Sequence, residues 1–332
     1  MHKSRIDIPV LMLFFNRPKQ LEKVFEQVKI ARPSKLYLFQ DGAREGREDD
    51  LENVQKCREI VENIDWECEV HKNYQEKNNG CDPSEYLAQK WMFETEEMGI
   101  VLEDDDVPSQ SFFPFCKELL EKYKDDERIN IICAMNNTGV SKHISDSYLF
   151  TKKGSIWGWA SWKRVIDTWD GKYTWLDDKN AIEKIKSQMS KREFDLYIET
   201  ARKRRISGKE YYETILAASM YLNDRLNIVP KYNMMCNVGI AQETTHSVSD
   251  IRLMSKIARK LFYMKTYEIE FPLSHPKEIK RDYKFEREMT PGFFKRACAK
   301  VESVCRVICY GGFSMLKTKI KNRRNRIKNG EK

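Results

Sequence analysis

The chain has 332 residues, with 41% hydrophobic and 33% charged side chains and a formal net charge of +8. This composition is typical of an ordered globular protein, and no stretch approaches the ~18 uninterrupted apolar residues that a membrane span needs. The 9 cysteines are scattered without a CxxC pair. The pattern argues against a disulfide framework or a zinc knuckle and favours a reducing compartment, the cytoplasm. Asp7 and Pro9 interrupt the region that a secretory signal would need apolar.

The basic character lies at the carboxyl-terminal end. Residues 293–332 contain 12 Lys or Arg and 2 Glu, a charge of +10, so residues 1–292 carry 8 − 10 = −2. The positive charge therefore says nothing about the chemistry of the body of the protein.

The first elements predict a βαβ unit. Residues 9–15 form an unbroken apolar run, which is typical of a strand buried on both faces of a parallel sheet. Pro18 suits the first turn of a helix, and residues 19–30 carry apolar side chains at helical spacing. Residues 35–39 form a second buried strand. The fold class is therefore α/β, with a mostly parallel central sheet flanked by helices.

Polar residues follow these strands. Arg17 and Asp41 both stand where a strand ends, at the edge where α/β proteins bind ligands. Gly80 stands at a loop-to-helix junction, where a glycine lets the backbone approach a ligand. The plainer alternative is that all three are ordinary turn residues, with Gly80 required for a positive φ.

The most informative stretch is residues 99–106, in which a short aliphatic strand runs into the four carboxylates of Glu103, Asp104, Asp105 and Asp106. Four like charges at a strand end are costly to hold together without a cation among them. Oxygen ligands of this kind suit Mg²⁺ or Mn²⁺ with phosphate oxygens. An exposed acidic turn is the alternative, but the position at the ligand-binding edge favours a metal-nucleotide site.

Several motifs resemble a known family. The segments PVLMLFFNRP, LFQDG, NNGC and GIVLEDDD resemble the nucleotide-binding half of GT-A glycosyltransferases. The likeness is to the N-acetylglucosaminyltransferase I type and to bacterial glycosyltransferase family 2-like proteins. In the former, a Glu-Asp-Asp motif is followed six residues later by a Phe-Phe pair. Here Glu103-Asp104-Asp105 precedes Phe112-Phe113 at the same spacing.

The resemblance implies a role for each matching residue. Asp105 would coordinate the divalent metal, Mn²⁺ or Mg²⁺, and Asp104 would contact the ribose. Arg17 would contact phosphate or sugar, and Asp41 the uracil edge of a uridine diphosphate sugar. Glu103 and Gly80 would belong to the same nucleotide-sugar site.

An aromatic cluster follows in the second half of the chain. Trp157, Gly158 and Trp159 begin a segment with three tryptophans in six residues. Aromatic faces stack on sugar rings, so an acceptor platform is one interpretation and ordinary core packing is the other. A Trp-Gly-Trp-like segment beside the sugar site of similar enzymes favours the platform.

A catalytic acid is expected before the apolar helix at residues 215–222. Inverting transfer needs a carboxylate to remove the acceptor hydroxyl proton. By resemblance, counting back from Pro230 to an aromatic-Asp-Tyr segment places that acid at Glu213, with Glu210 as the reserve candidate. The alternative for both is that they complement the dipole of the helix amino terminus.

Residues 233–247 match a further pattern of the bacterial relatives. Asn233 to Gly239 reproduces an Asn-aliphatic-aliphatic-small-Asn-aliphatic-Gly run, followed by Thr-Thr-His-Ser at residues 244–247. The resemblance assigns Asn237 to the acceptor side. It makes His246 a second metal or diphosphate contact.

The tail at residues 293–332 shows apolar residues at helical spacing among Lys and Arg, and then a dense basic run. Such a helix commonly lies on anionic lipid. A helix packed on the body and a nucleic-acid-binding tail are the alternatives, and aromatic residues before the basic run favour lipid. We therefore expect no nucleic-acid partner and a location in the cytoplasm, peripheral to the cytoplasmic face of the inner membrane.

The sequence thus predicts a metal-dependent glycosyltransferase of the GT-A fold that moves a sugar from a nucleoside diphosphate, expected to be uridine diphosphate, to a glycan or lipid-linked acceptor. We expect inversion, with Glu213 as general base. The alternatives are a non-catalytic GT-A-like protein that binds membrane or nucleic acid, and a retaining transferase. Residues 1–135 would form the nucleotide-sugar half of the domain, 136–292 the acceptor half and 293–332 a basic extension.

Overall fold

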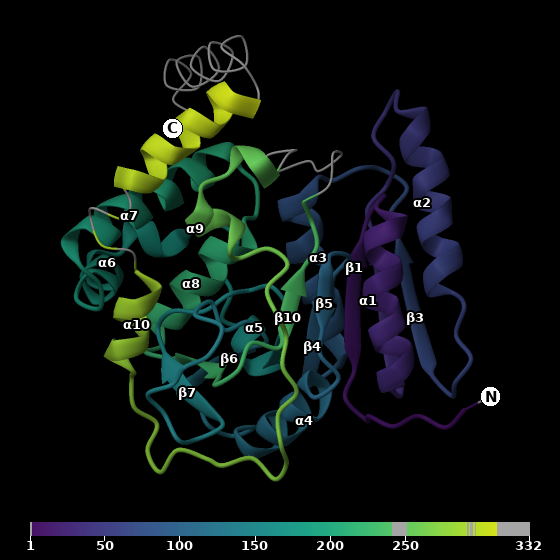
Figure 1. The fold of residues 1–332 in the computed structure, drawn as a ribbon, viewed down its shortest axis with the longest axis horizontal. Helices are drawn as coiled ribbons and strands as arrows, with labels where there is room; N and C mark the ends of the chain where they lie inside the picture. Colours follow the sequence, from purple (N-terminus) through teal and green to yellow (C-terminus); the bar gives the residue numbers. More distant parts are fainter. Residues whose placement is uncertain (1, 241–250, 291, 293–294, 296, 311–332) are drawn as a thin grey trace.

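The computed structural model describes residues 2–240, 251–290, 292, 295 and 297–310. It confirms a mixed α/β fold in which helices flank a central sheet (Figure 1). The described residues form an eight-stranded sheet in the order β3-β2-β1-β4-β8-β6-β9-β7. The strands are β1 Val10–Phe14, β2 Lys35–Gln40, β3 Glu69–Tyr74, β4 Met98–Glu103, β6 Ile129–Cys133, β7 Tyr148–Thr151, β8 Trp159–Trp162 and β9 Leu226–Pro230.

The sheet is mostly parallel. Strands β3, β2, β1 and β4 pair in parallel, and so do β6 and β9. The exceptions are β8, which runs antiparallel between β4 and β6, and β7, which runs antiparallel to β9 at the edge. Because β8 comes from the predicted acceptor half and pairs with β4, the two predicted halves share one sheet; the division at residue 135 stays a prediction.

Alternating side chains of the strands bury against helices on both faces of the sheet. Val10 and Met12 of β1 belong to one core cluster, and Leu11 and Leu13 to the other. Helices α1, α2 and α4 contribute to the first cluster, and α3, α6, α7 and α8 to the second. Their bounds are α1 Pro18–Ala31, α2 Glu48–Val61, α3 Cys81–Thr95, α4 Phe112–Lys122, α6 Lys179–Lys186, α7 Lys191–Ser207 and α8 Tyr212–Leu222. Burial on both faces explains why β1 and β2 contain unbroken apolar runs.

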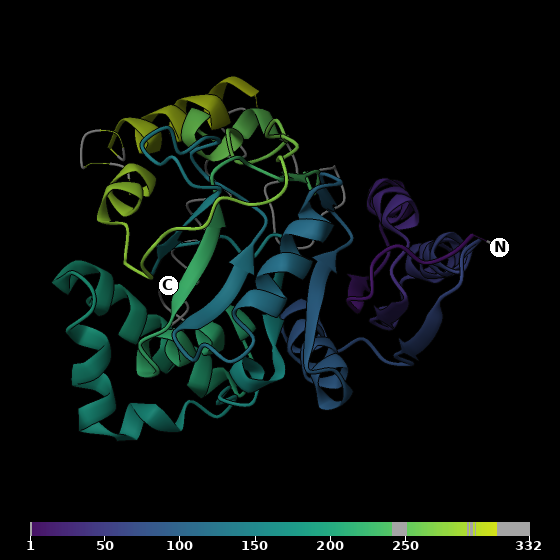
Figure 2. The ribbon, with the colours of Figure 1, turned by 90° about the horizontal axis from the view of Figure 1, so that it is seen from below.

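A small antiparallel pair stands beside the main sheet. It joins β5, Asp106–Pro108, to β10, Met235–Asn237. The remaining helical segments are α5 Lys163–Ile166, α9 Lys256–Arg259, α10 Tyr283–Met289, the 3-10 turns Thr174–Asp177 and Ile251–Leu253, and residues 297–310. Viewed from below, the teal helices α6 and α7 lie well apart from the yellow helix at residues 297–310 (Figure 2). Within the described ranges no helix is both long enough and apolar enough to cross a bilayer.

One lysine stands out in the packing of β7 against α10. The Lys152 side chain is buried, at 7% exposure, and its Nζ has no hydrogen-bond partner among the described residues. It lies over the ring of Tyr221, 5.5 Å from the centroid. Burial lowers the pKa of Lys152 to about 8, against an ordinary value of 10.5.

We predict that Lys152→Met stabilises the protein at pH 7 by about 2 kcal/mol, because a buried ammonium without a hydrogen bond is replaced by an apolar chain. The folded state binds the Lys152 proton more weakly than the unfolded state. The charged lysine therefore lowers the free energy of unfolding by its full amount below about pH 8. The advantage of the variant should therefore shrink between about pH 8 and pH 10.5. Urea unfolding at several pH values measures this. Lys191→Met, at an exposed lysine, should change stability by less than about 0.5 kcal/mol at every pH.

Candidate functional site

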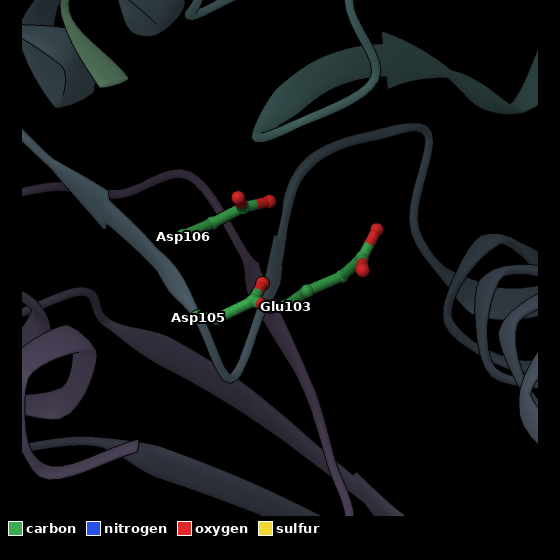
Figure 3. Close-up of side chains that lie close together, drawn as sticks. All are labelled: Glu103, Asp105 and Asp106. Atoms are coloured by element: carbon green, nitrogen blue, oxygen red, sulfur yellow. The ribbon is translucent and has the colours of Figure 1, made fainter. Parts of the chain in front are cut away.

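Three carboxylates gather where β4 passes into β5. Glu103 ends β4, Asp104 and Asp105 form the turn, and Asp106 begins β5. One carboxylate oxygen from each of Glu103, Asp105 and Asp106 lies within 4.8 Å of the others (Figure 3). The turn places the three groups on one side of the backbone, as a metal site requires.

The residues present fit a divalent cation. Asp106 is fully buried, and its Oδ2 has no hydrogen-bond partner among the described residues. The Asn237 amide of β10 donates to Oδ1 of Asp105 and Oδ1 of Asp106, at 3.1 Å each, and so orients both carboxylates. An all-oxygen set of acids with an unsatisfied buried oxygen is the chemistry that Mg²⁺ or Mn²⁺ prefers.

Arg17 also reaches into the acidic turn. Its Nη1 donates to Oδ2 of Asp105 at 2.8 Å, and its Nη2 contacts Oδ1 of Asp104. Burial lowers the pKa of Arg17, but the charges of Asp104 and Asp105 outweigh it and raise that pKa, so the guanidinium stays charged. Arg17 therefore supplies one positive charge among the four acids that the sequence runs together.

One guanidinium does not neutralise the whole cluster. Burial, together with the charge of Asp105, raises the pKa of Glu103 to about 8. Burial, together with the charge of Glu103, raises the pKa of Asp106 well above its ordinary value. The pKa of Asp105 is raised by burial, against the opposing pull of Arg17. The electrostatic cost of ionising these acids together is what a bound cation would remove.

Asp41 holds the turn at residues 78–80. Its carboxylate accepts from the backbone N–H groups of Asn79 and Gly80, at 2.8 and 3.0 Å, and from the Asn78 amide at 2.9 Å. Gly80 has a φ of +86°, so the turn does use the backbone freedom of glycine. Asp41 thus fixes the loop that precedes α3, and its predicted contact with uracil stays a prediction.

A cavity of about 240 Å³ joins these features. It is lined by all five residues that the sequence predicts for the nucleotide sugar: Arg17, Asp41, Gly80, Glu103 and Asp104. They come from four separate stretches of the chain, and the sheet brings them to one edge. Their roles stay predictions, but their convergence on one hollow is a property of the fold.

The cavity also has a lining that sequence reasoning missed. Glu85 of α3 accepts a hydrogen bond from the Cys81 thiol at 3.2 Å, and burial raises its pKa well above the ordinary value. Lys209 reaches the cavity from the loop before α8, and Arg44 from the loop after β2. The sequence did contain a signal for Glu85, because this acid lies one helical turn after Cys81, at the start of the helix that follows Gly80.

Glu213, the predicted general base, is not among the residues that line the cavity. Glu213 is in the first turn of α8; its side chain is 49% exposed and pairs with Arg204 at 3.0 Å. The preceding residue, Tyr212, is buried and donates through its hydroxyl to Oε1 of Glu103 at 3.3 Å. The charge of Glu213 contributes to the raised pKa of Glu85. Glu213 is therefore one residue from a side chain that contacts Glu103, and its charge acts on Glu85.

The three predicted acceptor residues around Trp157 differ in exposure. Trp159 is buried within β8, where it is paired with Val101 of β4. Trp157 is half-buried and packs against the ring of Phe262. Gly158 has a φ of +63°, and a Cβ there would clash with the Met235 methyl group. Trp159 is therefore part of the packed core, and the predicted acceptor-binding roles of Trp157, Gly158 and Trp159 stay predictions.

The last predicted ligand, His246, lies outside the described residues, as does the whole run 244–247. Asn237 is buried between Asp105 and Asp106, so the described contacts place it at the acidic turn. Its predicted contact with the acceptor is not tested by them.

No protein-family model and no curated protein matches the chain. Among solved structures, a UDP-glucose pyrophosphorylase complexed with UDP-glucose is similar at 9% identity and a TM-score of 0.35, covering 69% of this chain and 92% of that one. The inositol-1-phosphate CTP transferase from T. maritima is similar at 10% identity and a TM-score of 0.34, covering 68% and 86%. A 4-diphosphocytidyl-2C-methyl-D-erythritol synthase from Anaerococcus prevotii is similar at 11% identity and a TM-score of 0.29, covering 49% and 74%. Likenesses this distant carry no functional argument, which has to come from the site itself.

Gly239 gives a test of the acidic turn. A Cβ at this position would clash with Oδ2 of Asp105 and lie 2.9 Å from its Cγ. We predict that Gly239→Ala displaces the Asp105 carboxylate and weakens Mn²⁺ binding by about 10- to 100-fold, because residues that hold a metal ligand in place affect affinity by this much. Titration calorimetry with Mn²⁺ measures this. Gly292→Ala is the control, because a Cβ there meets no atom of the described residues within 4 Å; equal Mn²⁺ affinity in both variants would contradict the prediction.

Proposed function

We propose that this protein is a metal-dependent glycosyltransferase that moves a sugar from a nucleoside diphosphate, uridine diphosphate in the first instance, to a glycan or lipid-linked saccharide. The proposal includes inversion at the anomeric carbon. The observation that carries it is the cavity, whose lining includes Glu103, Asp104 and Arg17 and which therefore adjoins the acidic turn that fits a cation.

The charges of the site suit an activated sugar. When bound, a divalent cation neutralises a diphosphate and makes it a better leaving group. Glu103, Asp105 and Asp106 are the residues that would hold it. Arg17 carries a permanent charge at the same turn and would bind a phosphate oxygen as negative charge develops on the departing diphosphate.

Two further residues would position the nucleoside and activate the acceptor hydroxyl. Asp41 would keep the 78–80 loop in the shape that receives the base and ribose. Glu213 would remove the proton from the acceptor hydroxyl as that oxygen attacks the anomeric carbon. Its ion pair with Arg204 holds the side chain at the start of α8, and the neighbouring Tyr212 donates to Glu103. Because Glu213 is paired with a cation, it should be tested against Glu210, which lies two residues before α8.

An acceptor held in a membrane would require the enzyme to work at that surface. A location on the cytoplasmic face of the inner membrane, with anionic lipid as a partner, therefore belongs to the same proposal.

Hydrolysis of UDP-glucose and UDP-N-acetylglucosamine with Mn²⁺ tests the metal dependence. We predict activity that EDTA abolishes and that falls by about 100-fold or more in Asp105→Asn, because the variant loses a charged ligand. Asp125→Asn, at an acid whose side chain is 88% exposed, should retain wild-type activity. Full hydrolysis in Asp105→Asn, or in EDTA, would contradict the proposal. A thermal-shift screen of nucleotide sugars with Mn²⁺ identifies the donor beforehand, because a bound donor raises the melting temperature.

The general base has its own test once a donor and an acceptor are known. We predict that Glu213→Gln lowers kcat for transfer by about 10²- to 10⁴-fold, while the thermal shift given by the donor stays unchanged. Glu210→Gln is the matched control and should transfer normally. The reverse pattern would assign the base to Glu210, and substantial transfer in both variants would argue for a retaining mechanism.

A further inference from the structure

The helix at residues 297–310, called here the carboxyl-terminal helix, turns charged side chains toward the body of the protein and apolar side chains toward solvent. Ordinarily a surface helix buries its apolar stripe and turns its polar side to water. Here Glu302 and Arg306 are half-buried, whereas Val301 and Val304 are exposed. The helix lies on the outside of the molecule beside α9 (Figure 1).

Polar contacts fix this orientation. Glu302 Oε2 accepts from the backbone N–H of Lys256 at the start of α9, at 3.0 Å, and its Oε1 pairs with Arg259 at 3.5 Å. Arg306 donates to Oε1 of Glu302 at 2.7 Å and to the carbonyl oxygen of Arg252 at 3.3 Å. Glu302 and Arg306 are one helical turn apart, so they define the side of the helix that faces the body.

The outward side is apolar along its length. Val301 and Val304 are three residues apart and lie on one stripe, together with Ala297 and Ile308. Cys298, Cys305 and Cys309 lie beside this stripe, between it and Glu302. The exposed members of the stripe and of the cysteine row are Ala297, Cys298, Val301, Val304, Cys305 and Cys309, with Ile308 half-buried. Val307 is the apolar side chain of this helix that the body buries.

The positive charge near the carboxyl-terminal helix indicates what kind of partner binds its exposed apolar side. Residues 311–332, which follow the helix directly, carry 8 Lys or Arg and 1 Glu, a charge of +7 by sequence. Lys295 and Lys300 are exposed on or beside the helix. An apolar strip flanked by cations is complementary to a surface with an anionic layer over hydrocarbon, that is, an anionic bilayer.

We propose that the carboxyl-terminal helix docks the protein on an anionic membrane through the side that carries Val301, Val304 and Cys305. The ion pairs of Glu302 and Arg306 hold that side outward before any lipid is present, so the helix needs no rearrangement to bind. Valine side chains enter the boundary of the acyl chains, and the basic residues contact lipid phosphates. This docking specifies the membrane part of the proposed function, but it needs no active site.

Vesicle co-sedimentation of the full-length protein tests the docking. The vesicles are phosphatidylcholine alone or phosphatidylcholine mixed with phosphatidylglycerol, without nucleotide or metal. The wild-type protein should bind the mixed vesicles more tightly, and salt should weaken that binding. Val301→Glu should weaken it by about tenfold or more, because the variant loses an apolar side chain that would enter the lipid and adds a charge that anionic lipid repels.

Leu51→Glu on α2 is the matched control. Leu51 is 63% exposed and Val301 is 64% exposed, so both variants add the same charge at equally exposed helical positions. Leu51→Glu should bind vesicles within about twofold of wild type. Both variants should keep the wild-type melting temperature and the wild-type thermal shift with nucleotide sugar and Mn²⁺, which separates lost docking from a failed transferase proposal.

Three results would overturn the docking. The first is equal vesicle binding by Val301→Glu and the wild-type protein, or an equal loss in Leu51→Glu. The second is a wild-type dimer that Val301→Glu dissociates, because the apolar side would then be a contact between two copies of this chain. The third is tight binding to duplex DNA with no binding to the mixed vesicles.

Discussion

The structure depends on how four consecutive carboxylates are accommodated at one turn. Like charges this close repel strongly wherever water is excluded. The fold answers with one guanidinium, from Arg17, and one amide, from Asn237. Arg17 contacts one oxygen each of Asp104 and Asp105, and Asn237 contacts the other oxygen of Asp105 and Oδ1 of Asp106. The second oxygen of Asp104 accepts from the backbone N–H of Phe15 at 3.3 Å, and Oδ2 of Asp106 has no partner among the described residues. A turn that keeps such an unfavourable arrangement is understandable if a cation completes it.

The small β5–β10 pair makes that arrangement possible. Asn237 stands opposite Asp106 in the register of this pair, and the backbone N–H of Val238 donates to the carbonyl oxygen of Asp105 at 2.8 Å. Gly239 then leaves the space that the Asp105 side chain occupies. Three successive residues of β10 and its extension therefore orient, tie down and make room for the acids. On the other side of the turn, Arg17 comes from the loop after β1, so the site connects both halves of the chain.

Much of the first half could be predicted from the sequence, because its signals are local. Unbroken apolar runs at residues 9–15 and 35–39 are the strands β1 and β2, and the acids after Leu102 do follow a buried strand. Parallel strands share one carboxyl edge, so Arg17, Asp41 and Glu103 could be expected to meet. The cavity lining confirms that they do meet, without testing what they bind.

The rest depends on tertiary packing, which one sequence does not reveal. Composition cannot show that Trp159 is buried in a strand between β4 and β6 while Trp157 is half-buried. Nor does spacing show that Glu85 and Lys209, which are far apart in the sequence, line the same cavity. Helical periodicity predicted an amphipathic tail, but only the contacts of Glu302 show which side of it faces the body.

The most direct measurement of the central claim is anomalous diffraction from a crystal soaked with Mn²⁺ and uridine diphosphate. The account predicts a manganese peak about 2.1 Å from oxygens of Asp105 and Asp106, with the diphosphate in the cavity beside Arg17. An empty acidic turn at saturating manganese, or a peak elsewhere with Asp105 facing solvent, would contradict it.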